Sequence, residues 1–214
     1  MKNVDADKIR GIVAKLVSGE LSPSVANEDG RKYDGYTGQI NYNGTDAKVE
    51  NATFLLKDGN IIWDRGEWLE GVWHDGIWNG GVWHDGIWER GVWKRGVWQY
   101  GIWKGLNGKD TIWELGTWKM GNWYDGTWKN GFWKYGFWNN GNWENGKWER
   151  GAWNNGVWTG GIHCDGDWYG GKFNGGTWEG GTWRGDNSMW LNGEWKNGKD
   201  YAGESRTCPP SDWN

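Results

Sequence analysis

Two histidine–aspartate pairs are the residues in this chain that most resemble metal ligands. His74-Asp75 and His84-Asp85 lie in an identical octapeptide, Gly-Val-Trp-His-Asp-Gly-Ile-Trp, which occupies 71–78 and again 81–88. Imidazole and carboxylate groups bind Zn²⁺ when three or four of them converge on one point. A metal site here would require a fold in which side chains separated by ten residues in the sequence lie next to each other.

A third histidine stands beside a thiol, the arrangement that nucleophilic catalysis uses when the two groups meet. His163-Cys164-Asp165 supplies an imidazole base and a cysteine nucleophile in sequence. Adjacent side chains on an extended segment point to opposite faces, however, so these two would diverge. His163 also stands where the surrounding sequence places tryptophan, and we interpret it as a core substitution. Cys164 and Cys208 are predicted to be free thiols.

Basic residues in the middle of the chain could bind a polyanion, with strongly salt-dependent affinity. The candidates are Lys94, Arg95, Lys104, Lys109, Lys119, Lys129 and Lys134. The formal net charge is −4, which does not indicate a nucleic-acid or membrane partner. The simpler interpretation is that these side chains occupy the solvated outer positions of a repeat.

A five-residue repeat must position all of these groups. Between Trp63 and Trp183 every fifth residue is tryptophan except at Gly108, His163 and Phe173. Glycine stands two residues before nearly every one, so the segment reads as G-x-W-x-x without a frame shift. The chain holds 25 Trp and 40 Gly. A period this strict indicates a repeat architecture.

Two all-β architectures could produce the period. One is a single-layer antiparallel meander, similar to MORN repeats, with type I′ turns at the Asn-Gly and Asp-Gly pairs. The other is a solenoid in which each pentapeptide forms one side of a coil and both the small residue and the aromatic point inward. Ala, Thr, Leu and Ser tolerate the positive φ of such a turn poorly, yet they fill the glycine slot at a few positions. These are Ala47, Ala52, Leu106, Thr111 and Ser188. The slot is therefore predicted to need a small side chain more than an unusual backbone, which favours the solenoid.

The pattern small-x-aromatic-x-x over roughly 47–198, and above all the stretch Ala-Lys-Val-Glu-Asn-Ala-Thr-Phe at 47–54, resembles the pentapeptide-repeat proteins. The resemblance implies a right-handed, four-sided β-solenoid with four pentapeptides per coil. Gly and Trp replace the usual inward Ala and Leu or Phe, so the lost methyl group makes room for the larger ring in a close-packed interior. The Trp-rich version also resembles uncharacterised repeat proteins of large tailed phages.

Either architecture argues against a metal site at the two histidine–aspartate pairs. In a four-sided coil His74 and His84 lie on opposite sides, and in the meander they lie about 9–10 Å apart on one edge. An internal duplication explains the repeated octapeptide better.

The tryptophans are predicted to be the core rather than a binding surface. Burying one indole removes on the order of 200 Å² from water, worth about 5 kcal/mol. If the rings lay outside, the residues between them would be too few and too interrupted to form any other core.

The chain divides into three parts: an N-terminal helix and loop at 1–46, the repeats at 47–198, and a polar tail at 199–214. Residues 5–18 are predicted to form an amphipathic helix that caps the solenoid or docks on a partner, and 19–46 are predicted to be a loop. The candidate docking residues are Ile9, Ile12, Val13, Leu16 and Trp213. The sequence contains neither a membrane-spanning stretch nor a signal-peptide core.

Neither architecture is expected to bring together a set of acid, base, nucleophile or metal ligands, so the sequence predicts a non-enzymatic structural or protein-interaction scaffold without a cofactor. We expect a phage virion component, in the virion or the cytoplasm, that binds a protein partner or stacks on another copy through the solenoid ends. A carbohydrate-binding adhesin is one alternative, using exposed aromatic side chains such as Tyr100, Tyr124, Tyr135 and Tyr169. A DNA-mimicking inhibitor of a DNA-processing enzyme is another, and the central lysines and weak net charge argue against it.

Overall fold

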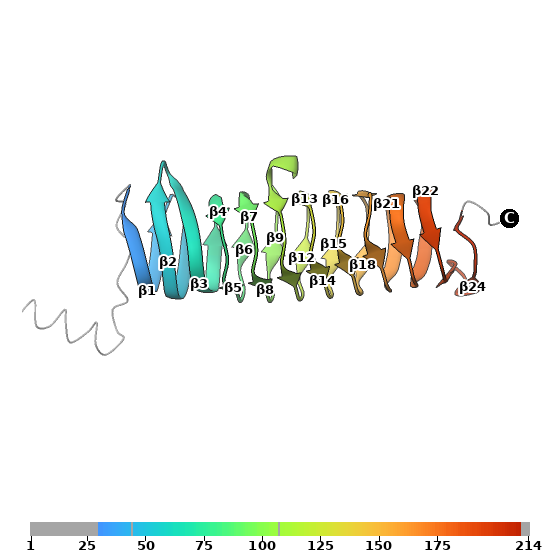
Figure 1. Ribbon diagram of the computed structural model, residues 1–214, viewed down its shortest axis with the longest axis horizontal. Coiled ribbons are helices and arrows are strands. Elements are labelled where there is room, and N and C mark those ends of the chain that lie inside the picture. Colours follow the sequence, from blue (N-terminus) through green and yellow to red (C-terminus); the bar gives the residue numbers. More distant parts are fainter. Residues whose placement is uncertain (1–29, 44, 107, 211–214) are drawn as a thin grey trace, which may run out of the picture.

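The computed structural model describes residues 30–43, 45–106 and 108–210. The chain winds into an all-β solenoid of about nine turns, with its strands stacked along the long axis of a rod (Figure 1). The helix expected over 5–18 lies outside the described residues. Because most neighbouring strands in the rod pair in parallel, the meander alternative does not describe the repeats.

The N-terminal end of the rod is a three-stranded antiparallel sheet. β1 (Lys32–Tyr42) pairs with β2 (Thr45–Lys57), and β2 pairs with β3 (Asn60–Trp73). The loop expected over 19–46 is therefore wrong for residues 32–42, a strand in which Gly38, Ile40 and Tyr42 point inward and alternate with exposed residues. Residues 47–57, expected to be repeats, belong to β2 instead. Parallel coiling begins with β3.

The short strands of the coils follow, most of them two residues long. They are β4 (Gly76–Trp78), β5 (Val82–Trp83), β6 (Ile87–Trp88), β7 (Val92–Trp93), β8 (Val97–Trp98), β9 (Ile102–Trp103), β10 (Ile112–Trp113), β11 (Thr117–Trp118), β12 (Asn122–Trp123), β13 (Thr127–Trp128), β14 (Phe132–Trp133), β15 (Phe137–Trp138), β16 (Asn142–Trp143), β17 (Lys147–Trp148), β18 (Ala152–Trp153), β19 (Val157–Trp158) and β20 (Ile162–His163). The longer β21 (Asp167–Trp178) and β22 (Thr182–Trp195) each run through more than one side of the coil.

Each coil contains three pentapeptides, not the four that the family resemblance implies. Trp63 is paired with Trp78, and Trp128 with Trp143, in both cases fifteen residues further along. Successive rings in a coil meet edge to face, as Trp93 and Trp98 do with centroids 6.0 Å apart and planes at 69°. These contacts fall within the range preferred by aromatic pairs. A fourth side would separate the rings and leave an unfilled centre, which close packing disfavours.

On each of the three sides, the residue between glycine and tryptophan points outward. Face I consists of Ile62, Ile77, Val92, Ile112, Thr127, Asn142, Val157, Lys172 and Met189. Face II consists of Glu67, Val82, Val97, Thr117, Phe132, Lys147, Ile162, Thr177 and Glu194. Face III consists of Val72, Ile87, Ile102, Asn122, Phe137, Ala152, Asp167, Thr182 and Lys199. The two residues after each tryptophan form the corners.

The interior is three parallel columns of stacked indoles, so the prediction that the rings point inward is confirmed. Trp113 lies over Trp128 with centroids 4.7 Å apart and planes 6° from parallel, and both side chains are 0% exposed. The same offset stacking recurs along all three columns. It holds the coils in register because a shift of one residue would turn every ring outward.

Glycine is required in the repeat by its backbone conformation, which corrects the prediction that only a small side chain is needed. Gly121 has φ +137°, and a Cβ there would collide with the carbonyl oxygen of Gly101 in the preceding coil. That carbonyl accepts the N–H of Asn122 at 3.0 Å, one bond of the ladder between coils. The conformation is almost closed to residues with a Cβ.

The other residues found in the glycine slot all stand where regular coiling is interrupted. Ala47 and Ala52 belong to the antiparallel β2, Leu106 lies in a loop, and Thr111 and Ser188 each follow an insertion. They do not occupy the strained slot of a continuous coil, which explains why they are tolerated.

One whole pentapeptide is inserted between Gly105 and Thr111, and its described residues, Leu106 and the 3₁₀ turn η1 (Gly108–Asp110), lie outside the coil. As a result Trp93 pairs with Trp113, twenty residues on. Gly108 lies in this inserted pentapeptide and does not occupy a tryptophan slot of the coil. A glycine in such a slot would leave a void where the indole packs. A second insertion, at Asp186-Asn187, makes Phe173 pair with Trp190.

His163 and Phe173 do occupy tryptophan slots, and both are fully buried. His163 stacks on Trp178 with centroids 3.9 Å apart, and its Nδ1 lies 3.2 Å from the carbonyl oxygen of Gly180. Trp148 donates its Nε1–H to the corresponding carbonyl, that of Asp165, at 3.1 Å. His163 therefore keeps the stacking of this column together with the ring N–H bond that Trp148 makes. The expectation of a core substitution is correct.

The C-terminal end is closed by a small hairpin of β23 (Gly198–Lys199) and β24 (Ser205–Arg206). Asp200 occupies the place that the next aromatic ring above Trp183 would take, and it is 2% exposed. Its carboxylate lies 2.6 Å from the guanidinium group of Arg206. The segment expected to be a polar tail from residue 199 therefore begins as a folded cap.

Adjacent glycines allow a matched test of the backbone requirement. Gly81 has φ +120° and its Cβ would collide with the carbonyl oxygen of Gly66, whereas Gly80 has an ordinary φ and its Cβ would lie 3.5 Å from Arg95. We expect Gly81→Ala to lower the free energy of unfolding by at least about 2 kcal/mol. Gly80→Ala should change it by less than about 1 kcal/mol. Urea denaturation followed by circular dichroism measures both, and equal losses would contradict the assignment.

The buried histidine should make the protein less stable in acid. Burial lowers the pKa of His163 to about 3, from an ordinary value of 6.5. Between these values the unfolded chain binds a proton that the folded chain excludes, so stability falls as pH drops through this window, by about 1.4 kcal/mol per pH unit.

The control for this prediction is His163→Phe, because Phe173 shows that phenylalanine fills such a slot. Urea midpoints compared at about pH 7 and about pH 4.5 should show native protein losing roughly 3 kcal/mol more than the variant. A parallel loss in the two proteins would show that His163 is already charged when folded.

Candidate functional site

The structure does not bring the two histidine–aspartate pairs together. His74 lies on the corner between faces III and I, where its Nδ1 is 2.9 Å from Glu89. His84 lies on the corner between faces II and III, where its Nε2 is 2.8 Å from Glu67. Each histidine belongs to its own ladder of polar side chains along the rod. Within the described residues, no group of three or more His, Cys, Asp or Glu side chains could hold a metal ion.

His163 and Cys164 diverge, as their adjacency predicts. The imidazole is in the core, while the Cys164 thiol is partly exposed at a corner, 3.7 Å from Glu179. Burial raises the pKa of the Cys164 thiol, the opposite of what activates a nucleophile. Within the described part of the chain, Cys164 and Cys208 form no disulfide.

The basic residues are distributed over all three corners instead of forming one patch. Lys94, Arg95 and Lys129 follow face I, Lys119 and Lys134 follow face II, and Lys104 follows face III. Lys104 pairs with Glu89 at 3.1 Å and Lys129 pairs with Glu114 at 3.6 Å. The backbone of Lys109 is in the loop that contains η1. The docking candidates Ile9, Ile12, Val13, Leu16 and Trp213 lie outside the described residues.

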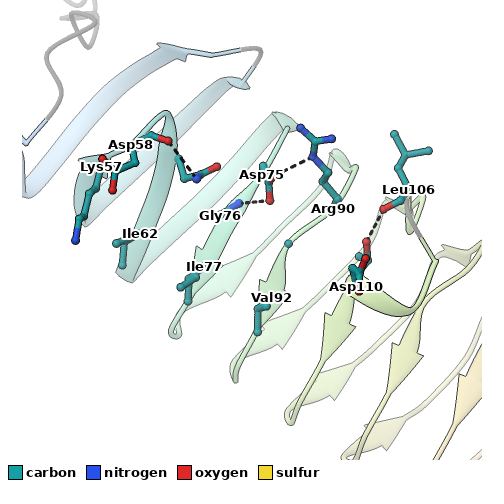
Figure 2. Close-up of a pocket in the computed structure, with 13 residues that line it drawn as sticks. Lys57, Asp58, Ile62, Asp75, Gly76, Ile77, Arg90, Val92, Leu106 and Asp110 are labelled. Atoms are coloured by element: carbon teal, nitrogen blue, oxygen red, sulfur yellow. Dashed lines mark hydrogen bonds and ion pairs between the residues drawn. The ribbon is translucent and has the colours of Figure 1, made fainter.

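A groove on face I, near the N-terminal end, is the best-formed candidate site. Its floor is the row Ile62, Ile77 and Val92, contributed by β3, β4 and β7, with about 460 Å³ of space above it. Figure 2 shows the three side chains in line on successive strands. Each stands in the outward slot between glycine and tryptophan, so the packing of the core directly sets their spacing.

The two ends of the groove are formed by segments that break the repeat. Lys57, Asp58 and Asn60 from the β2–β3 turn line one end, and Leu106 and Asp110 from the inserted loop line the other (Figure 2). These walls are the reason that an otherwise flat face becomes a groove.

Hydrogen bonds hold both walls in place. Asn43 donates from Nδ2 to the carbonyl of Gly59 at 2.9 Å in the turn. In the loop, Leu106 donates its N–H to the carbonyl of Glu89 at 2.8 Å, and its own carbonyl accepts the Thr111 hydroxyl at 2.7 Å. The groove is thus largely formed in advance of any binding.

One rim of the groove carries an ordered charge pair. Arg90 Nε lies 2.9 Å from an Asp75 carboxylate oxygen, and the other Asp75 oxygen accepts the N–H of Gly76 at 2.7 Å. Lys57, Asp58 and Asp110 add charges of both signs at the ends. The lining therefore combines an aliphatic floor with polar and charged side chains at the rim and at both ends.

Sequence reasoning missed this groove although its floor residues are visible in the printed chain. Ile62, Ile77 and Val92 form a row only once the coil is known to contain fifteen residues. The wall at 106–110 is also hidden, since an insertion of one whole pentapeptide leaves the frame of the tryptophans unchanged.

Comparison with known proteins gives no match to this chain among family models, curated proteins or solved structures. Of the helices in the described part of the chain, none has the length and apolar character needed to cross a bilayer.

Proposed function

We propose that the chain is a non-enzymatic scaffold that holds the face I groove against a protein partner within a larger assembly. The groove is the observation that supports this most. Its aliphatic floor, its two fixed walls and its charged rim together match the anatomy of a protein interface, in which an apolar centre is surrounded by polar groups.

The rest of the molecule suits a rigid support. Two backbone hydrogen bonds join each pentapeptide to the coil before it, as when Lys94 and Val97 donate to the carbonyls of Trp78 and Gly81 at 2.8 and 3.0 Å. Stacked indoles fill the interior, and such an interior resists bending because close-packed rings transmit strain. The rod keeps the groove at a fixed distance from whatever its far end touches.

The partner that fits best is a protein segment presenting two or three aliphatic side chains. Ile62, Ile77 and Val92 offer apolar contact with no aromatic platform, and the Asp75–Arg90 pair gives a partner backbone both an acceptor and a donor at the rim. A few side chains packed in a desolvated centre provide most of the binding energy of a protein interface.

The resemblance to Trp-rich repeat proteins of tailed phages supports a virion, or an intermediate in its assembly, as the setting. In that setting the rod is a spacer or connector, and its ends are the natural sites of contact with further copies.

The test compares two aspartate substitutions in the same row of face I. Ile77→Asp places a charge on the groove floor, whereas Val157→Asp places it in the equivalent slot far outside the groove. The native full-length chain, isolated gently from the cells that make it, should sediment with complexes much larger than its 24.6 kDa mass. Ile77→Asp should leave at least about tenfold less chain in those fractions, as expected from loss of about 1.4 kcal/mol or more of interface energy.

The Val157→Asp control should sediment as the native chain does, with an unchanged circular dichroism spectrum. Sedimentation of the native chain as a monomer would contradict the proposal, and so would equal release by the two substitutions.

A further inference from the structure

Face III is bordered by every tyrosine of the repeats. Tyr100 and Tyr135 occupy the corner position that immediately precedes face III, and Tyr124 and Tyr169 occupy the position that immediately follows it. Their exposures lie between 45% and 51%, so half of each side chain faces solvent. By contrast, the described corner residues between faces I and II include no aromatic side chain. The tyrosines are therefore gathered along one side of the rod.

The four tyrosines alternate from edge to edge along the rod axis. Tyr100, Tyr124, Tyr135 and Tyr169 belong to the third, fourth, fifth and seventh coils after the start of β3. Parallel strands lie about 4.8 Å apart, so the series spans about 19 Å. Aromatic rings placed in this way can contact successive units of an extended chain that lies along the face.

A hollow of about 360 Å³ lies at the C-terminal end of this series, between Tyr135 and Tyr169. Its floor contains Phe137, which is 51% exposed, followed by Ala152 and Asp167 on the next two strands. The short Ala152 side chain leaves the ring of Phe137 uncovered on that side. The floor therefore combines an aromatic surface with a depression next to it.

Two charge pairs supply polar groups to the hollow: Arg150, Asp165 and Asp167 line it, and Arg184 is bonded to Asp167. Arg150 Nε lies 3.2 Å from Asp165, and Arg184 Nε donates to Asp167 at 2.7 Å. These contacts hold the two guanidinium groups through Nε, and the other oxygen of Asp165 accepts the N–H of Gly166 at 2.8 Å, so the Nη donors are the groups best placed to bond a ligand. Charged donors and acceptors of this kind form strong hydrogen bonds with hydroxyl groups.

We propose that face III binds an extended, uncharged oligosaccharide whose sugar rings stack on the exposed aromatic side chains. The hollow at Phe137 holds one sugar unit, with its hydroxyl groups bonded to the Arg150–Asp165 and Arg184–Asp167 pairs. Tyr124 and Tyr100 contact units further along the same chain. The charges of the two pairs balance, which favours a neutral sugar over an anionic one. The aliphatic groove of face I has no such aromatic surface, so the two faces have different ligands.

The experiment is affinity electrophoresis of the full chain in native gels cast with soluble neutral polysaccharides. Dextran, glycogen, arabinoxylan and mixed-linkage β-glucan are the probes. We expect at least one of them to retard the native protein. Phe137→Ala and Tyr169→Ala should each weaken that retardation at least tenfold, and Ala152→Arg should abolish it by filling the hollow.

The matched control is Phe132→Ala, since Phe132 is 53% exposed in the same coil as Phe137 but lies on face II. It should be retarded as the native chain is, and Ile77→Asp should be as well, which separates this site from the face I groove. The inference is overturned if no probe retards the native protein, or if Phe132→Ala weakens retardation as much as Phe137→Ala does. Near-ultraviolet circular dichroism of each variant establishes that the indole core is intact.

Discussion

The face-to-face stacking of indoles at fifteen-residue intervals is the interaction on which the rest of the molecule depends. Each ring lies on its counterpart in the next coil, as Trp118 lies on Trp133 with centroids 4.8 Å apart, and meets the edges of its neighbours along the chain. Three such rings fill the cross-section of the coil. The size of the indole therefore sets the number of sides, and the number of sides decides which outward residues become neighbours.

The glycine requirement follows from the same stacking. When coils lie close enough for their indoles to touch, each repeat glycine packs against the glycine carbonyl of the preceding coil. Only glycine readily adopts the backbone conformation that this close approach needs. Such a strict rule leaves little freedom within the coils. The departures from it, the β2–β3 turn and the loop at 106–110, build the groove on face I. The outward and corner residues vary from coil to coil, and this variation places the tyrosines along the edges of face III.

The inward direction of the tryptophans could be predicted from the sequence, because nothing else in the repeat could form a core. The number of sides could not, since a period of five residues is compatible with a coil of any whole number of pentapeptides. Leu106 to Asp110 preserve the tryptophan frame, so the loop they form is not visible in the pattern. The exposure of Tyr100 and Tyr169 was expected from their outer positions, but their gathering beside one face requires the fifteen-residue register. Residues such as Thr111 in the glycine slot led to the prediction that the slot needs only a small side chain. That prediction was wrong because the sequence does not show that the coil is interrupted at Thr111.

Disulfide formation between engineered cysteines tests the three-sided coil most directly. In a background with Cys164 and Cys208 replaced by serine, Phe132→Cys can be combined with Lys147→Cys or with Ala152→Cys. Lys147 is paired with Phe132 on the next strand of face II, fifteen residues on, whereas Ala152 lies on face III. Neighbouring strands are about 4.8 Å apart, within the Cα separation that a disulfide spans. The three-sided coil predicts rapid cross-linking of the first pair and none of the second. Cross-linking of the second pair alone, twenty residues apart, would show four sides and contradict the account.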